Sequence, residues 1–242
     1  KYLTDPKAYP ALEKLVLVVI PVYNVDGCLH RNSYSRANQE GPESYGFRGN
    51  ARNYDLNRDF LKCDSRNART FNQVFTHWLP DIFVDNHTSN GADYQYTMTL
   101  IATQHNKLEA PLGQFLQETM LPALYLDMAQ RKWEMIPYVD SPAETPDSGI
   151  VGFCDYGRYS TGYAALWNTI GFMPETHMLK PFADRLWSTY HFMDAVIHFI
   201  GSNHWELVEL KGRCLGGEFT ATGALTNVQA LARKREHDAL AA

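Results

Sequence analysis

The segment Thr169-Ile170-Gly171-Phe172-Met173-Pro174-Glu175-Thr176-His177 is an apolar run that ends in a carboxylate and an imidazole. We interpret 169–174 as a strand that delivers Glu175 at its end. Leu15-Val16-Leu17-Val18-Val19-Ile20-Pro21-Val22 is a longer β-branched run that stops at a proline. Such a run is typical of a strand buried on both faces, so we expect a central strand here.

Helical patterns alternate with strand patterns along the chain. The range 66–78 has apolar residues three and four apart and predicts an amphipathic helix that Pro80 ends. The ranges 108–131 and 185–200 predict two further helices, the first with a kink at Pro122. This alternation predicts an α/β fold.

Changes in composition along the sequence indicate how the chain is divided into a domain and a tail. The ranges 24–57 and 137–157 are long and rich in turn-forming residues, which in a compact domain is typical of functional loops. After Trp205 the sequence becomes Gly- and Thr-rich and then weakly apolar. We therefore expect one domain over 1–205 and a peripheral tail over 206–242.

Composition excludes several classes of function. The 242 residues include 22 Lys and Arg against 27 Asp and Glu, a net charge of −5, and the longest basic run is Arg233-Lys234-Arg235. A mildly acidic chain without a basic patch predicts no nucleic-acid partner. No apolar run approaches the ~20 residues that cross a bilayer, so we expect no membrane span. The four cysteines form no C-x-x-C pair and predict neither a zinc knuckle nor a dense disulfide framework.

The range 47–60 concentrates three arginines and three asparagines beside apolar anchors. Arg58 lies between Leu56 and Phe60, which indicates a partly sequestered side chain. Because guanidinium groups bind carboxylates through two hydrogen bonds, an anionic substrate group is a natural partner. The alternative is a structural ion pair with Asp55 or Asp59.

Two further residues are candidates for chemistry at strand ends. His87 follows the predicted strand 81–86, at the end of an α/β strand where such sheets bind ligands, and neutral imidazole is the commonest metal ligand. A lone His is also often a hydrogen-bonded structural residue, and His177 is a possible second ligand. Glu175 follows an apolar strand, which favours a raised pKa and a general base. The alternative for Glu175 is a salt bridge to Arg or Lys.

Taken in order, these segments resemble the zinc metallocarboxypeptidases, most closely their bacterial branch. Ile20-Pro21-Val22-Tyr23-Asn24-Val25-Asp26-Gly27 resembles the family's Pro-x-x-Asn-Pro-Asp-Gly element. The blocks that follow in the expected order are Arg48-x-Asn50-Ala51, Asp55-Leu56-Asn57-Arg58-Asp59-Phe60, His87 and Glu175. The resemblance covers about 15–200 and implies a zinc carboxypeptidase-like fold, with a mixed, mostly parallel central sheet and helices on both faces.

The resemblance implies a zinc-dependent peptidase that hydrolyses the C-terminal peptide bond. His87 would be the last of three protein ligands to the zinc ion. Glu175 would act as general base and acid on a metal-activated water, and Arg48 would polarise the scissile carbonyl and stabilise its oxyanion. Three protein ligands and a water are the arrangement of a catalytic zinc.

Substrate binding follows from the same resemblance. Asn57 and Arg58 would hold the substrate's terminal carboxylate. Arg158 and Tyr159 are candidates for further substrate contact, although Tyr156 and Tyr163 compete with Tyr159 for the role of the family's substrate-capping tyrosine. The residues that set side-chain specificity would lie within 136–163, and the sequence indicates neither the preferred side chain nor an oligomeric state.

The metal site is incomplete in this sequence. The family takes its first two zinc ligands from a His-x-x-Glu element upstream, and none of the 23 residues before Asn24 is a His. The chain is then either part of a longer zinc enzyme or a remnant that has lost catalysis. The start without Met and the abrupt entry into a strand favour the first. A sheet without its first strands would expose an edge, so we expect the chain to associate.

Two other functions stay open on the same residues. A zinc amidohydrolase would act on a small N-acyl amino acid, whose free carboxylate also suits Arg58. A non-catalytic module would bind peptide C termini through Arg48 and Arg58 without zinc. Any targeting signal would lie upstream, so the compartment is not predicted beyond the tendency of similar proteins to be exported.

Overall fold

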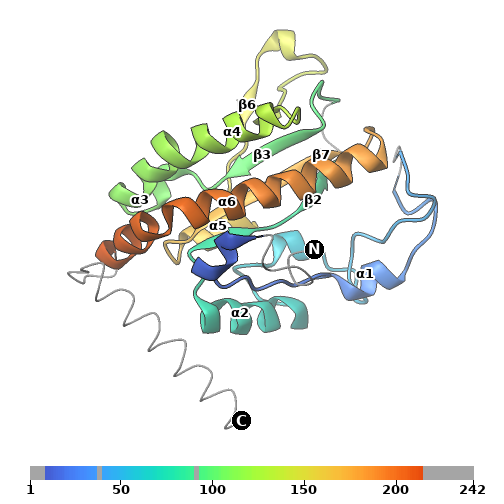
Figure 1. Ribbon diagram of the computed structural model, residues 1–242. Coiled ribbons are helices and arrows are strands. Elements are labelled where there is room, and N and C mark those ends of the chain that lie inside the picture. The colour runs from blue at the N-terminus through green and yellow to red at the C-terminus, as the bar shows by residue number, and fades with distance from the viewer. Residues whose placement is uncertain (1–8, 37–39, 90–92, 215–242) are drawn as a thin grey trace.

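The computed structural model describes residues 9–36, 40–89 and 93–214. Its main sheet is built around one long central strand (Figure 1). The strands are β1 (Ile82–Val84), β2 (His87–Ser89), β3 (Met98–Ala102), β4 (Met135–Pro137) and β7 (Ile170–His177). β1 and β2 pair with β7 in parallel, β3 pairs with β7 antiparallel, and β4 pairs with β3 in parallel. The predicted mixed, mostly parallel sheet is confirmed.

Helices cover both faces of this sheet, as predicted. They are α1 (Val25–Leu29), α2 (Arg66–Trp78), α3 (Ala110–Phe115), α4 (Leu121–Gln130), α5 (Ser160–Ala165) and α6 (Phe182–Cys214). Alternate residues of a strand point to opposite faces. Ile170 and Phe172 of β7 are buried in a cluster with residues of α3, α4 and α6. Met173 packs on the other face against Ile101 and Tyr159. This second face carries the candidate site.

Helix α2 has the predicted boundaries because its ends are encoded locally. The Ser65 hydroxyl accepts a hydrogen bond from the backbone N–H of Ala68 at 3.0 Å and caps the start. The helix ends at Leu79, which adopts a left-handed conformation with φ of 43° just before Pro80. In the 108–131 segment the irregularity is a π-helical stretch, Leu116–Met120, placed immediately before the predicted kink at Pro122.

Helix α6 continues past the expected domain boundary between 205 and 206. Leu207 and Lys211 are buried, and the Lys211 ammonium donates to the Pro80 carbonyl at 2.5 Å and lies 3.2 Å from an Asp81 carboxylate oxygen. The helix thus anchors the chain just before β1. The rest of the expected tail, 215–242, lies outside the described residues. Across the described ranges, no helix combines the length and apolar character that a membrane span needs.

The prediction of a central buried strand at 15–22 is wrong. The segment is extended but has no strand partner among the described residues, and Val16 and Val19 are 72% and 59% exposed. After it, the Tyr23 ring packs on Phe60 and Phe71. A β-branched run favours an extended backbone, but only a neighbouring strand makes it part of a sheet. β1, at the edge of the described sheet, pairs with β7 alone.

A small two-stranded sheet interrupts the predicted loop 137–157. β5 (Val139–Asp140) and β6 (Val151–Gly152) pair antiparallel and project away from the main sheet (Figure 1). The remaining connections contain 3₁₀ turns at Pro10–Lys14, Leu56–Arg58, His105–Lys107 and Pro146–Ser148.

Candidate active site

The pairing of β2 with β7 brings His87 opposite Glu175. Their Cα atoms are register partners, and His87 Nδ1 lies 3.7 Å from Glu175 Oε1. The other ring nitrogen, Nε2, lies 2.8 Å from Asp85 Oδ2. Asp85 directly follows β1, whereas Glu175 lies within β7, which continues to His177 instead of ending at 174 as predicted. The imidazole therefore lies between two carboxylates. The two residues singled out on separate strands are therefore neighbours, and Asp85 is a third group that we did not predict.

Burial and neighbouring charges shift the pKa values of both members of this pair. Burial raises the pKa of Glu175 to about 7, although the neighbouring His87 opposes the rise. Burial lowers the pKa of His87, but the carboxylates of Asp85 and then Glu175 outweigh it and raise the pKa to about 9. Glu175 Oε2 is buried and has no hydrogen-bond partner among the described residues. Within those residues no Arg or Lys pairs with Glu175, so the salt-bridge alternative is not supported.

The Asn-x-Asp-Gly element positions the loop that carries Arg48. The Asn24 side chain donates from Nδ2 to the carbonyls of Phe47, Arg48 and Gly49 at 3.3, 3.0 and 3.2 Å. Its Oδ1 accepts from the Gly27 N–H at 3.0 Å, capping α1. Two residues on, Asp26 Oδ2 accepts from the Ala51 N–H at 3.0 Å. The element therefore fixes the backbone on both sides of Arg48.

Gly27 allows the loop that carries Arg48 to approach helix α1 closely. The Phe47 N–H donates to the Gly27 carbonyl at 2.8 Å. A Cβ added at Gly27 would lie 2.1 Å from the Phe47 carbonyl oxygen, a separation that real Cβ atoms essentially never show. Only glycine permits this crossing of the two backbones.

Arg48 and a second arginine form the cationic side of the site. Nε and Nη2 of Arg48 both lie 2.8 Å from Asp55 Oδ2, with the Arg48 side chain 43% exposed. Arg36 is half-buried in the same region, where burial and then the charge of Arg48 lower its pKa, while Glu175 and Asp55 oppose this. Arg36 was not predicted, because only the closure of the long loop brings it near Glu175.

Asn57 and Arg58 lie in a 3₁₀ turn that Asp55 caps by accepting from the Asn57 N–H at 3.0 Å. Asn57 Oδ1 is buried without a hydrogen-bond partner among the described residues. Arg58 Nη1 donates to the Asn57 carbonyl at 2.7 Å. The predicted alternative, an ion pair of Arg58 with a neighbouring acid, is absent from the described residues. Asp55 pairs with Arg48, and Asp59 accepts from the backbone N–H groups of residues 64 and 65.

Arg58, Arg158 and Tyr159 meet, although Arg158 and Tyr159 follow Arg58 by a hundred residues. The guanidinium carbons of Arg58 and Arg158 lie 4.8 and 4.9 Å from the centroid of the Tyr159 ring. Arg158 Nη2 also donates to the Tyr159 hydroxyl at 2.8 Å. Tyr159 is 7% exposed and packs with Met173, which lies two residues before Glu175 on β7. The predicted substrate-contact residues thus share the sheet face of Glu175.

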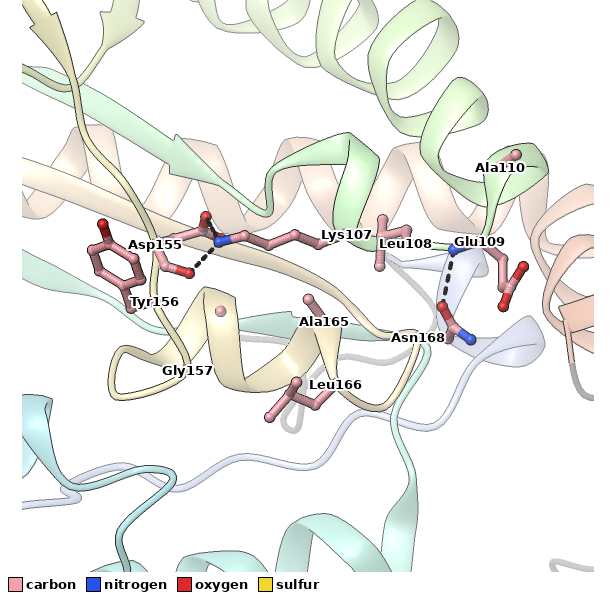
Figure 2. Close-up of a pocket in the computed structure, with 11 residues that line it drawn as sticks. Lys107, Leu108, Glu109, Ala110, Asp155, Tyr156, Gly157, Ala165, Leu166 and Asn168 are labelled. Carbon is pink, nitrogen blue, oxygen red and sulfur yellow. Dashed lines mark hydrogen bonds and ion pairs between the residues drawn. The ribbon is translucent and has the colours of Figure 1, made fainter.

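The loop that leads into Arg158 is held by an ion pair between Lys107 and the buried Asp155. Lys107 Nζ lies 2.5 Å from both Asp155 Oδ1 and the Asp155 carbonyl oxygen (Figure 2). Gly162 lets α5 approach closely, since a Cβ there would lie 2.0 Å from the Asp155 carbonyl oxygen. A cavity of about 580 Å³ lies beside this loop, lined in part by Lys107, Asp155 and Tyr156. Of the candidate residues named from the sequence, only Tyr156, the competitor of Tyr159, is among those that line it.

The residues present can supply one ligand of a metal site, His87. His87 has its Nε2 bonded to Asp85, the carboxylate–histidine pairing that orients metal-ligating imidazoles, and its Nδ1 faces the site. However, the described part of the chain contains no group of three or more His, Cys, Asp or Glu able to hold a metal ion. His177 is buried, and its Nδ1 accepts from the Leu179 N–H at 3.2 Å. The proposed pairing of His177 with His87 in one ligand set is therefore not supported.

No protein-family model matches the chain, and no curated protein matches it. Among solved structures, the chain is similar to a metallo-carboxypeptidase from Pseudomonas aeruginosa in complex with (2-guanidinoethylmercapto)succinic acid. The sequence identity is 17% and the TM-score 0.47, over 67% of this chain and 42% of that one. This chain thus covers less than half of that protein.

Proposed function

We propose that the chain forms the substrate-binding and acid–base part of a zinc metallocarboxypeptidase, which hydrolyses the C-terminal peptide bond of a peptide. One observation carries the proposal. Glu175, with a buried carboxylate oxygen that lacks a partner among the described residues, lies 3.7 Å from an imidazole that Asp85 orients. A buried carboxylate that forms no ion pair with a described Arg or Lys and lies beside a candidate metal ligand is suited to proton transfer.

The roles of the individual residues follow from this geometry. His87 would hold the zinc ion, which when bound lowers the pKa of a water toward about 7 and polarises a carbonyl. Glu175 takes a proton from the attacking water and returns it to the leaving amine nitrogen. Arg48, fixed by its loop, offers its guanidinium to the developing oxyanion, a contribution that can reach about 3–4 kcal/mol.

The substrate's terminal carboxylate would bind at the 3₁₀ turn. Arg58 has no acidic partner among the described residues, and its guanidinium lies over Tyr159. Its planar fork suits two parallel hydrogen bonds to a carboxylate. The unpartnered Asn57 Oδ1 is an acceptor for a substrate N–H group.

We also propose that the remaining zinc ligands come from a longer form of the protein. The sequence contains no His-x-x-Glu element, and one imidazole does not hold a catalytic zinc. Zinc content measured by elemental analysis tests this proposal. We expect stoichiometric zinc only in a form extended by such an element. Stoichiometric zinc in the 242-residue chain would overturn the proposal of outside ligands.

Hydrolysis of blocked dipeptides by the zinc-loaded extended form tests the function itself. We expect Glu175→Gln to abolish hydrolysis and Glu206→Gln, an exposed control on α6, to leave it unchanged. Activity that survives Glu175→Gln would remove Glu175 from the mechanism. Faster cleavage of N-acyl amino acids than of dipeptides would favour an amidohydrolase.

A second candidate is a non-catalytic module that binds peptide C termini. It is favoured because the described residues include Arg58, the proposed holder of a carboxylate, but no group of three or more His, Cys, Asp or Glu able to hold a metal ion. Two results together would favour this module. This chain would bind peptides without zinc and equally well after Glu175→Gln, and no zinc-loaded form would hydrolyse them.

A further inference from the structure

Two arginines meet at one aromatic ring on the face of the candidate site. The guanidinium carbon of Arg58 lies 4.8 Å from the Tyr159 centroid and that of Arg158 lies 4.9 Å from it. Because both distances end at the same point, the two cations are closer together than the Debye length of about 10 Å at 0.1 M salt. Their mutual repulsion is therefore only partly screened.

Neither guanidinium is neutralised by the residues that the structure describes. Arg58 donates to the Asn57 carbonyl and Arg158 to the Tyr159 hydroxyl, and neither forms an ion pair with a described acid. The nearest acid in sequence to Arg158 is Asp155, whose Oδ1 is bound by Lys107 at 2.5 Å. Two cations that lack a carboxylate partner and repel each other favour the binding of anionic groups.

The two arginines differ in their surroundings. Arg58 is half-buried in the turn after Asp55, whereas Arg158 is exposed. The backbone that leads into Arg158 is held by the Lys107–Asp155 ion pair (Figure 2), and Tyr159 is fixed by its packing on Met173. The exposed guanidinium thus extends from a rigid base toward the ring that it shares with Arg58.

We propose that Arg158 binds a second carboxylate of the substrate, so that the site prefers a C-terminal acidic residue. This inference rests on the proposed function, because it takes Arg58 as the holder of the terminal carboxylate. The shared ring keeps the two guanidinium groups close enough to bind the two carboxylates of one residue. A substrate with an uncharged side chain would leave Arg158 unpaired.

Binding of N-benzoyl-Glu and N-benzoyl-Gln to the 242-residue chain tests the proposal without zinc or turnover. The two ligands have nearly the same size and differ in the side-chain charge. We expect N-benzoyl-Glu to bind about fivefold more tightly in an NMR titration, as for an ion pair with an exposed arginine. The preference should fall as salt is added. Arg158→Gln should abolish it, and Arg66→Gln, an exposed control on α2, should retain it.

The outcomes separate this inference from the proposed function. Equal binding of the two ligands by the unmodified chain overturns the role of Arg158 and leaves the carboxylate site intact. An Arg158→Gln variant that weakens both ligands equally also overturns it, since Arg158 would then contact the terminal carboxylate. If neither ligand binds, the carboxylate site at Arg58 fails, and the proposed function fails with it.

Discussion

Substitution of Gly27 by alanine tests the crossing that positions Arg48. Gly27 lies in α1, where alanine is favoured over glycine by about 1 kcal/mol. Against this, the new Cβ would lie 2.1 Å from the Phe47 carbonyl oxygen and 2.4 Å from Asn24 Nδ2. The backbones must separate, which weakens the 2.8 Å hydrogen bond from Phe47 N–H and the Asn24 clamp. Overpacking of this kind costs about 1–3 kcal/mol and each hydrogen bond about 1 kcal/mol. We therefore expect a net loss of about 2–3 kcal/mol.

The assay is urea unfolding of Gly27→Ala beside Gly152→Ala. Gly152 is exposed and a Cβ there meets nothing within 4 Å, so the control should change the free energy of unfolding by less than about 0.5 kcal/mol. A Gly27→Ala variant that equals or exceeds the stability of the unmodified chain would refute the reasoning, because helix propensity would then outweigh the contact.

Three further predictions concern side-chain hydrogen bonds that stabilise the fold. Asn24→Asp keeps the acceptor for the Gly27 N–H but turns a carboxylate oxygen toward the carbonyls of residues 47–49, so we expect the free energy of unfolding to fall by about 1–2 kcal/mol in thermal unfolding. Unchanged stability would show that the hydrogen bonds from Asn24 Nδ2 do not stabilise the loop. Burial raises the pKa of Asp59, but the hydrogen bonds that it accepts outweigh burial and lower the pKa overall. A lowered folded-state pKa stabilises the fold above the unfolded pKa of about 4, and the stabilisation is lost as pH falls through the folded pKa. The difference in unfolding free energy between the unmodified chain and Asp59→Asn should therefore be full near pH 7 and shrink below about pH 4; a constant difference would exclude this origin. Lys211→Ala should cost about 1–3 kcal/mol through the lost bond to the Pro80 carbonyl, and an unaltered denaturation midpoint would show that this bond contributes nothing.

Where local chemistry encodes an element, the sequence was sufficient to predict it. α2 was predicted within its true bounds because an amphipathic pattern leads directly to Pro80. The segment 15–22 was mispredicted because apolar β-branched residues specify an extended, buried-looking strand without specifying a partner. The π-helical stretch before Pro122 depends on packing, since Leu116 and Met120 are both fully buried.

The sequence singles out the candidate site residues one by one but not their arrangement. His87 and Glu175 were found as strand-end residues, yet their adjacency depends on the register of β2 with β7. Asp85 lies two residues before His87, and that spacing was a signal that could have identified it. Arg36 gave no comparable signal, since its approach to Glu175 depends on how a long loop closes.

The unpaired extended segment has a consequence for hydrogen exchange. The backbone amides of 15–20 donate no hydrogen bond to a described residue, so they should exchange with solvent at close to the rate of an unstructured peptide. Amides of β7, with strands on both sides, should exchange only when the whole domain opens. Any strand that pairs with 15–20 would slow the exchange of alternate amides along the segment. The pattern of slowed amides would then show which residues of the segment pair and which edge of it faces the added strand.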